Sequence, residues 1–276
     1  MDKIGIIGFG NMGSSIASQL KKHYQVFVFD KDTSKTRSKD LLAIFYAKNI
    51  NDLVSLAEVV FLAVKPQDID AVLKELKNHI NGKLVISIAA GITTGHIERM
   101  LGKARVIRAM PNIGLKIGES VTCLCKGANA GEEELIFAQE LFCYLGSCKI
   151  IEEDLMNAAT AISGSGPGYI YDFLDTNAIR PDDVPEHLRH DLMKRLEKAA
   201  MVVGFSHEDA VFLAANTVNS SIILTQQTKI TPAELKKQVA SKGGTTEAAL
   251  EVIHKGGTWE EAAQAALNRA QALARR

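Results

Sequence analysis

The feature that most constrains the fold is a short apolar run that ends in three closely spaced glycines. The run KIGIIG, Lys3 to Gly8, has the length and composition of a strand buried on both faces. Gly8, Gly10 and Gly13 complete the pattern G-x-G-x-x-G, and the residues that follow, MGSSIASQLKK, have a helical period. A strand, a glycine-rich turn and a helix in this order are typical of a Rossmann-type dinucleotide-binding domain.

Each glycine has a separate predicted role. Gly8 makes the tight turn, Gly10 lets a pyrophosphate approach the backbone, and Gly13 lets the helix pack on the strand. The N-terminus of the helix, with its unpaired N–H groups, then faces the phosphates. The predicted cofactor-binding residues of this loop are Gly8, Phe9, Gly10, Asn11, Met12 and Gly13. The alternative is a glycine-rich turn that holds no ligand.

A second predicted strand, QVFVFD, ends at Asp30, twenty residues after Gly10. An acidic residue at this place typically accepts hydrogen bonds from the two ribose hydroxyls of NAD. Lys31, Lys35 and Arg37 lie nearby in the sequence, and they are typical either of a site for the extra phosphate of NADP or of a solvated loop. We therefore expect NADH or NADPH as the cofactor, with NADH slightly favoured because Asp30 repels a 2′-phosphate.

Three further apolar segments, 57–66, 83–91 and 104–112, predict strands. In an open parallel sheet, ligands bind beyond the carboxyl ends of the strands. The residues at those ends are Val64, Lys65 and Pro66, then Ala89, Ala90 and Gly91, and then Met110, Pro111 and Asn112. Lys65 is typical either of a residue that borders the ligand or, equally, of a surface charge.

From about Glu152 the strand pattern stops, and amphipathic helical patterns follow. Thr231-Pro232 is a typical helix start, with threonine at the N-cap and proline at the first helical position. We therefore predict an α/β Rossmann-type domain over residues 1–151, followed by an all-α helical domain over residues 152–276. Because the helices of this second domain are rich in alanine and apolar residues, we expect them to form an interface with a second subunit.

Two motifs of the second half contain glycine and hydroxyl side chains. SGSGPGY at 163–169 is typical either of a close helix crossing or of a binding site. SKGGTTE at 241–247 precedes a predicted helix, so that unpaired N–H groups and the positive end of the helix dipole form a natural seat for a carboxylate. Thr246 adds a hydroxyl that both donates and accepts. The alternative for this motif is a plain N-cap without a ligand.

Composition excludes several classes of protein. The 276 residues include 32 Lys+Arg and 32 Asp+Glu without a basic stripe, so we expect neither nucleic acid nor a membrane surface as a partner. No signal peptide or bilayer-length apolar run is visible, which predicts a cytoplasmic protein. The four cysteines and seven histidines lack the spacings of metal sites, so we expect no metal.

Six motifs in register along nearly the whole chain resemble the pyrroline-5-carboxylate reductase family, and they are GFGNMG, AVKP, SIAAG, RAMPN, SGSGP and GGTTE. The resemblance implies a helical domain that interleaves with a partner, in homodimers or rings of dimers. It implies reduction of the cyclic imine 1-pyrroline-5-carboxylate to L-proline with NADH or NADPH, the last step of proline biosynthesis. It also implies that Ala63 to Pro66, Ala89 to Gly91 and Asn112 border the cofactor. The implied substrate-binding residues are Ser241, Gly243, Gly244, Thr245 and Thr246, and the hydroxyl of Thr246 is implied to act catalytically at the ring nitrogen.

The chain departs from the family pattern at three places. Lys242 stands where the family usually has proline, and MPNIG stands where it usually has MPNTP. The polar segment TNAIRPDDVPEHLRHD, residues 176–191, stands where family members normally have one continuous helix. This segment resembles an insertion, and we expect it to form a loop near the subunit interface.

Two other functions stay open at this point. A 3-hydroxyacid dehydrogenase has a similar two-domain build, but that family places a catalytic lysine shortly after its glycine-serine motif. Between Ser163 and Asn177 this chain has no lysine, which argues against that function. The second alternative is a dinucleotide-binding paralogue without catalytic activity.

Overall fold

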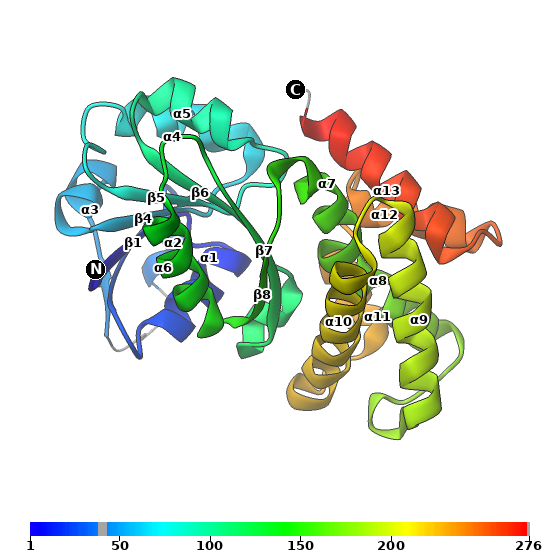
Figure 1. Cartoon of the computed structure of the whole chain (residues 1–276). Coiled ribbons are helices and arrows are strands. Elements are labelled where there is room, and N and C mark those ends of the chain that lie inside the picture. Colours follow the sequence, from blue (N-terminus) through cyan, green and yellow to red (C-terminus); the bar gives the residue numbers. More distant parts are fainter. Residues whose placement is uncertain (38–42, 275–276) are drawn as a thin grey trace. The chain divides into compact units, whose positions relative to one another are not determined.

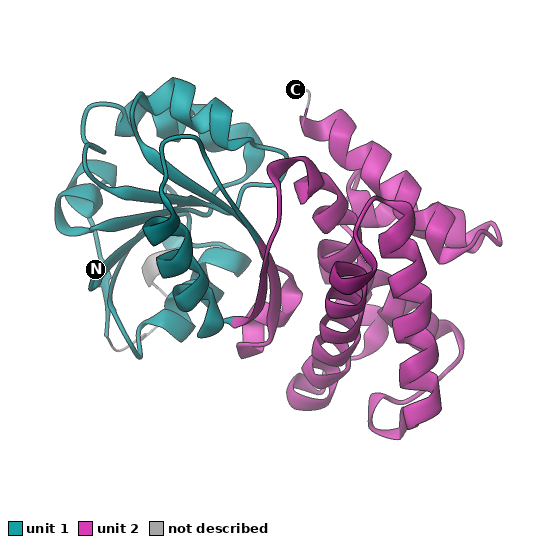
Figure 2. Ribbon diagram, in the orientation of Figure 1, with its two compact units in different colours: residues 1–109, 124–145 teal, residues 110–123, 146–276 magenta. Residues whose placement is uncertain are grey.

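The computed structural model describes residues 1–37 and 43–274 and divides into two compact units. The first unit comprises Met1–Ala109 and Leu124–Leu145, and the second comprises Met110–Cys123 and Gly146–Arg276 (Figure 2). The sequence predicts a boundary at residue 151, whereas residues 110–123 and 146–151 group with the second unit. The reason lies in the packing, because Ile113 and Ile117 pack against the buried side chains of Tyr171, Leu224 and Leu235.

The described strands form an eight-stranded sheet in the order β3-β2-β1-β4-β5-β6-β7-β8. The strands are β1 Lys3–Ile7, β2 Gln25–Phe29, β3 Ile44–Tyr46, β4 Val59–Leu62, β5 Leu84–Ser87, β6 Arg105–Met110, β7 Ser120–Lys126 and β8 Gly146–Ile150. Every pairing from β3 to β6 is parallel, with Ile4 opposite both Val26 and Val59. The predicted Rossmann-type fold is confirmed, and β3, β7 and β8 are strands that the sequence pattern did not predict.

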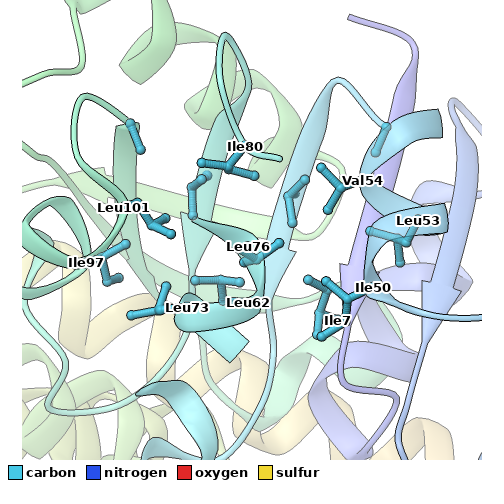
Figure 3. Close-up of a cluster of buried hydrophobic side chains, with 14 of the residues drawn as sticks. Ile7, Ile50, Leu53, Val54, Leu62, Leu73, Leu76, Ile80, Ile97 and Leu101 are labelled. Atoms are coloured by element: carbon cyan, nitrogen blue, oxygen red, sulfur yellow. The ribbon is translucent and has the colours of Figure 1, made fainter. Parts of the chain in front are cut away.

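The helices of the first unit are α1 Asn11–Leu20, α2 Ser34–Arg37, α3 Ile50–Leu56, α4 Ile69–Leu76, α5 Thr94–Leu101 and α6 Glu132–Cys143. Side chains of α3, α4 and α5 converge with the strand residues Ile7 and Leu62 in one apolar cluster (Figure 3). Two of these helices begin at side-chain caps, because Asn49 accepts from the N–H of Asp52 and Thr93 accepts from the N–H of His96. This packing fixes the strands whose carboxyl ends form the candidate site.

The second unit is helical after β8, as predicted (Figure 1). Its α-helices are α7 Met156–Ala159, α8 Gly166–Thr176, α9 Glu186–Val202, α10 His207–Thr228, α11 Pro232–Val239, α12 Thr245–His254 and α13 Trp259–Ala274. A π-helical turn, Thr160–Gly164, separates α7 from α8, because the N–H of Ser165 donates to the carbonyl of Thr160. Thr231 caps α11 with Pro232 at the first turn, which confirms the predicted helix start.

The segment 176–191 is a loop only in part. Helix α8 ends at Thr176, a short 3₁₀ turn covers Pro181–Asp183, and α9 already begins at Glu186. The side-chain amide of Gln226 in α10 donates to the carbonyl of Pro181 at 2.9 Å and so ties the loop to its own unit. Among the described residues, no helix is both long and apolar enough to cross a membrane.

Candidate active site

The glycine-rich turn after β1 has the geometry that its three glycines predict. Gly8 has φ +99°, and a Cβ on it would lie only 2.6 Å from the carbonyl oxygen of Ala63. A Cβ on Gly13 would overlap the carbonyl oxygen of Gly8, so helix α1 packs against the turn only because residue 13 is glycine. At Gly10, by contrast, no atom lies within 4 Å of where a Cβ would be. The turn thus leaves open space at the position predicted to face a pyrophosphate.

The N-terminus of α1 adds the positive partner that such a phosphate needs. Gly10 is the N-cap, and no described side chain caps the helix. The first turn contains no acidic residue, so that nothing within it opposes an anion. The N–H groups at the start of the helix therefore fit the pyrophosphate of a dinucleotide. Asn11 and Met12 begin the helix at this point.

Asp30 lies at the end of β2 and is 8% exposed. Its carboxylate accepts hydrogen bonds from the N–H of Phe9 at 2.7 Å and from the N–H of Asp32 at 2.8 Å. Lys35 forms an ion pair with it at 3.2 Å. Asp30 thus holds the glycine-rich turn through Phe9, and the two backbone N–H groups fix the orientation of its carboxylate. This role in holding the turn is one that the sequence did not predict.

The basic residues after β2 have different surroundings. Lys31 pairs with Asp68 at 2.7 Å, and this hydrogen bond lowers the pKa of Asp68. Lys35 is paired with Asp30, as described above. The side chain of Arg37 lies outside the described residues. Of the two described lysines, only Lys35 therefore lies against the carboxylate that is predicted to meet the ribose.

The other predicted cofactor segments follow neighbouring parallel strands. Ala63 to Pro66 follow β4, where the N–H of Ala63 donates to the carbonyl of Ile7, and Lys65 is exposed. Ala89 to Gly91 follow β5, where Gly91 has φ +76°. Because β2, β1, β4 and β5 are parallel neighbours, Asp30, the glycine-rich turn and these two segments lie along one edge of the sheet. The structure thus brings together all predicted cofactor residues of the first unit.

Asn112 follows β6 and belongs to the second unit. It is 2% exposed, and its side-chain oxygen accepts from the N–H groups of Gly114 and Val121 at 3.0 and 3.2 Å. Within the part of the chain that the structure describes, its Nδ2 is a buried donor without a hydrogen-bond partner. The oxygen therefore shapes the turn, and a contact of Asn112 with a cofactor stays a prediction.

The motif SKGGTTE forms the turn between α11 and α12. Gly243 has φ +69°, and Gly244 is the N-cap of α12, which no described side chain caps. Two amides expected to bind the substrate carboxylate already donate within the chain. The N–H of Gly243 donates to Glu247 Oε2 at 2.6 Å, and the N–H of Gly244 donates to the carbonyl of Ser241 at 2.9 Å. The role of these residues in binding a carboxylate stays a prediction, and the N–H groups of Thr245 and Thr246 at the start of α12 are the candidates that remain without an intrahelical partner.

The motif SGSGPGY packs against this turn. The hydroxyls of Ser165 and Thr245 are hydrogen-bonded at 2.9 Å. A Cβ on Gly168 would overlap Cγ2 of Thr246, so α8 and α12 approach closely only at a glycine. Thr246 is 3% exposed as a result. This contact fits the first interpretation of the motif, a close helix crossing, and the second interpretation, a binding site, stays a prediction.

Four residues near this turn escaped the sequence prediction, namely Ser165, Gly168, Glu247 and Arg269. Ser165 and Gly168 lie in a motif that was recognised, but no pattern indicated which of its residues contact the turn. Arg269 lies in α13, and its Nε donates to the carbonyl of Gly243 at 2.7 Å. No sequence signal distinguishes Arg269 from an exposed arginine of an amphipathic helix.

Two family models match separate parts of the chain. Residues 3–91 match the family model "NADP oxidoreductase coenzyme F420-dependent", and residues 191–275 match "Pyrroline-5-carboxylate reductase dimerisation". A pyrroline-5-carboxylate reductase from Aquifex aeolicus is 32% identical over 259 residues, which cover 92% of this chain and 90% of the relative.

Solved structures agree with these matches. A pyrroline-5-carboxylate reductase from Coxiella burnetii has a TM-score of 0.65 and 30% identity, with 98% of this chain and 97% of the other covered. A pyrroline carboxylate reductase from Plasmodium falciparum, solved with NADP bound, has a TM-score of 0.64 and 26% identity, with 99% and 98% covered. Since a relative more than 30% identical covers most of the chain, including both units, the chain belongs to the pyrroline-5-carboxylate reductase family.

Proposed function

We propose that this protein reduces 1-pyrroline-5-carboxylate to L-proline with NADH or NADPH, the last step of proline biosynthesis. The observation that carries the proposal is the start of α12, where no described side chain caps the first N–H groups and Thr246 is the second residue of the helix. A cyclic imine with one carboxylate has two polar groups, the carboxylate and the ring nitrogen. The N–H groups of this turn suit the carboxylate, and the Thr246 hydroxyl suits the nitrogen. Family membership and the open glycine-rich turn at Gly10 support the same function.

The residues of the two units have separate tasks in this proposal. The nicotinamide, when bound, supplies the hydride. The N–H groups of Thr245 and Thr246 hold the substrate carboxylate at the positive end of α12. Ser241 borders the same turn, since its carbonyl accepts from Gly244. The Thr246 hydroxyl donates to the ring nitrogen, which makes the neighbouring carbon more electrophilic as the hydride arrives. Positioning the ring in this way also removes much of the entropic cost of the reaction.

The first prediction is that the purified protein oxidises NADH or NADPH in the presence of 1-pyrroline-5-carboxylate and releases proline. Absorbance at the nicotinamide band and amino-acid analysis of the product measure the two sides of the reaction. Turnover with a 3-hydroxyacid or its carbonyl partner instead of the imine would favour the dehydrogenase alternative. Cofactor binding without turnover of either substrate would favour the non-catalytic paralogue.

We further propose that the enzyme favours NADH and tolerates NADPH. Two backbone N–H groups hold the Asp30 carboxylate, so it does not turn away easily from a cofactor phosphate. A carboxylate facing a 2′-phosphate at close range is unfavourable. The opposing attraction of Lys35 is weak, because its side chain is 43% exposed and exposed pairs contribute about 0–1 kcal/mol. The bound NADP of the Plasmodium falciparum relative supports tolerance of NADPH.

The second prediction tests this preference with two substitutions. Asp30→Ser removes the negative charge and should shift the ratio of kcat/KM values toward NADPH. Lys35→Gln removes the compensating cation and should shift the ratio toward NADH. Initial rates with both cofactors, at saturating imine, give the ratios. A wild-type enzyme that prefers NADPH tenfold would show that the basic residues outweigh Asp30.

We also propose that the chain forms a homo-oligomer, a dimer or a ring of dimers, in the cytoplasm. The match of residues 191–275 to a dimerisation model supports a dimer. Met201, Val202 and Val211, at the end of α9 and the start of α10, are apolar side chains that are more than a third exposed in the single chain. Sedimentation analysis that gives only a monomer at micromolar concentration would contradict this proposal. We expect no nucleic acid, membrane or metal as a partner.

A further inference from the structure

The peptide groups of Gly243 are held from both sides by two charged side chains. Its N–H donates to Glu247 Oε2 at 2.6 Å, and its carbonyl accepts from Arg269 Nε at 2.7 Å. Arg269 also lies directly against the turn, since its Nη2 would be 3.2 Å from a Cβ on Gly243. Helices α12 and α13 thus fix the turn through one negative and one positive group.

The negative group lies close to the seat of the substrate carboxylate. Glu247 is in the first turn of α12, the same turn whose N–H groups are proposed to hold that carboxylate. Two like charges at close range repel each other, and the repulsion is larger in a partly buried site than in water. Without compensation, Glu247 would therefore weaken the binding of an anionic substrate.

Arg269 is placed to supply that compensation. Its Nε donates to the carbonyl of Gly243, and the guanidinium has further N–H donors in the same plane. Lys242 is the other cation in the turn, but its side chain is exposed, whereas Arg269 is half-buried and anchored by its hydrogen bond. A fixed and partly desolvated charge acts more strongly than an exposed flexible one.

We propose that Arg269 determines the specificity of the enzyme for an imine that carries a carboxylate. It offsets the charge of Glu247 and holds the turn with the α12 N–H groups free for the anion. This inference rests on the proposed function, because it concerns the substrate of the same turn. It assigns Arg269 a positioning and electrostatic role rather than a catalytic one.

The experiment compares 1-pyrroline-5-carboxylate with 1-pyrroline, the same ring without the carboxylate. The measured quantity is kcat/KM for 1-pyrroline-5-carboxylate divided by kcat/KM for 1-pyrroline. Arg269→Met should lower this ratio about 10- to 100-fold, as expected for the loss of a charge-assisted interaction. Most of the change should be in KM for the carboxylated imine. Arg269→Lys keeps the charge without the planar fork and should give a smaller loss.

A second substitution tests the charge balance. Glu247→Gln keeps an acceptor for the N–H of Gly243 but removes the negative charge, so the double variant with Arg269→Met should recover part of the lost ratio. Arg195→Met is the matched control, because Arg195 pairs with Asp191 on the surface of α9 in the same unit. Thermal unfolding of each variant shows whether it is folded at the assay temperature.

The outcomes separate this inference from the proposed function. If Arg269→Met lowers kcat/KM for both imines equally, Arg269 only stabilises the turn and the inference is overturned. If the wild type reduces neither imine, the proposed function fails, and calorimetric titration with L-proline then decides the inference. Proline binding that Arg269→Met weakens would support it, and proline binding that is absent or insensitive to Arg269 would overturn it.

Discussion

Replacing Thr246 by alanine or valine is expected to lower kcat about 10- to 1000-fold, the range for loss of one positioned donor at the reacting centre. The hydroxyl is proposed to meet the ring nitrogen, and neither alanine nor valine has a donor there. Cofactor binding should be unaffected, because Thr246 is not among the residues predicted to bind the cofactor. Pre-steady-state rates of cofactor oxidation measure the chemical step, and fluorescence titration measures cofactor affinity.

The valine and serine variants separate chemistry from packing. Cγ2 of Thr246 fills the space beside Gly168, and valine keeps this methyl group while it removes the hydroxyl. Serine keeps the hydroxyl and loses the methyl group. We therefore expect serine to retain most of the activity and valine to lose it. Equal activity of the valine variant and the wild type would remove Thr246 from the mechanism.

Replacing Gly13 by alanine is expected to lower kcat/KM for the cofactor about 100-fold, the loss typical of a displacement of roughly 1 Å at a binding group. The new Cβ would overlap the carbonyl oxygen of Gly8. Because this oxygen belongs to the backbone, no side-chain rotation can relieve the overlap. Helix α1 must therefore move away from the turn. Overpacking of this kind also costs about 1–3 kcal/mol of folding stability, which denaturant unfolding measures.

Replacing Gly10 by alanine is the matched control for folding stability, because it adds the same methyl group to the same turn. Its Cβ would enter open space, and φ −77° at Gly10 suits any residue, so stability should stay within about 1 kcal/mol of the wild type. Cofactor affinity should nevertheless fall, because the methyl group would occupy the predicted path of the pyrophosphate. A Gly10→Ala protein that binds NADH normally would contradict the proposed position of the cofactor.

The sequence predicted the strands β1, β2, β4, β5 and β6 and the helix α1 because their signals are local. A buried parallel strand is a continuous apolar run, and each glycine of the turn after β1 has a steric reason that the pattern itself contains. The short edge strand β3 and the strands β7 and β8 were not predicted. Three residues, Ile44–Tyr46, are too few to establish a period, and the partly buried residues of β8 do not form an apolar run.

The site could be predicted only as far as its backbone. The turn from Ser241 to Thr246 was recognised. The hydrogen-bond partners of its backbone groups, however, include side chains that belong to the following helices. Glu247 takes the N–H of Gly243, and Arg269 reaches its carbonyl from a helix twenty-six residues away. The grouping of residues 110–123 with the helical unit likewise follows from Ile113 and Ile117, whose packing partners lie more than fifty residues further on. Such contacts leave no trace in local spacing.

The most direct test of the central claim is transfer of a labelled hydride. The assay uses NADH or NADPH deuterated at the transferable position of the nicotinamide C4, together with 1-pyrroline-5-carboxylate, and mass spectrometry and NMR of the product. The expected product is L-proline that carries deuterium at C5, the carbon of the former imine, in amounts equal to the cofactor oxidised. Cofactor oxidation without labelled proline, or no oxidation by folded protein with either cofactor, would contradict the central claim.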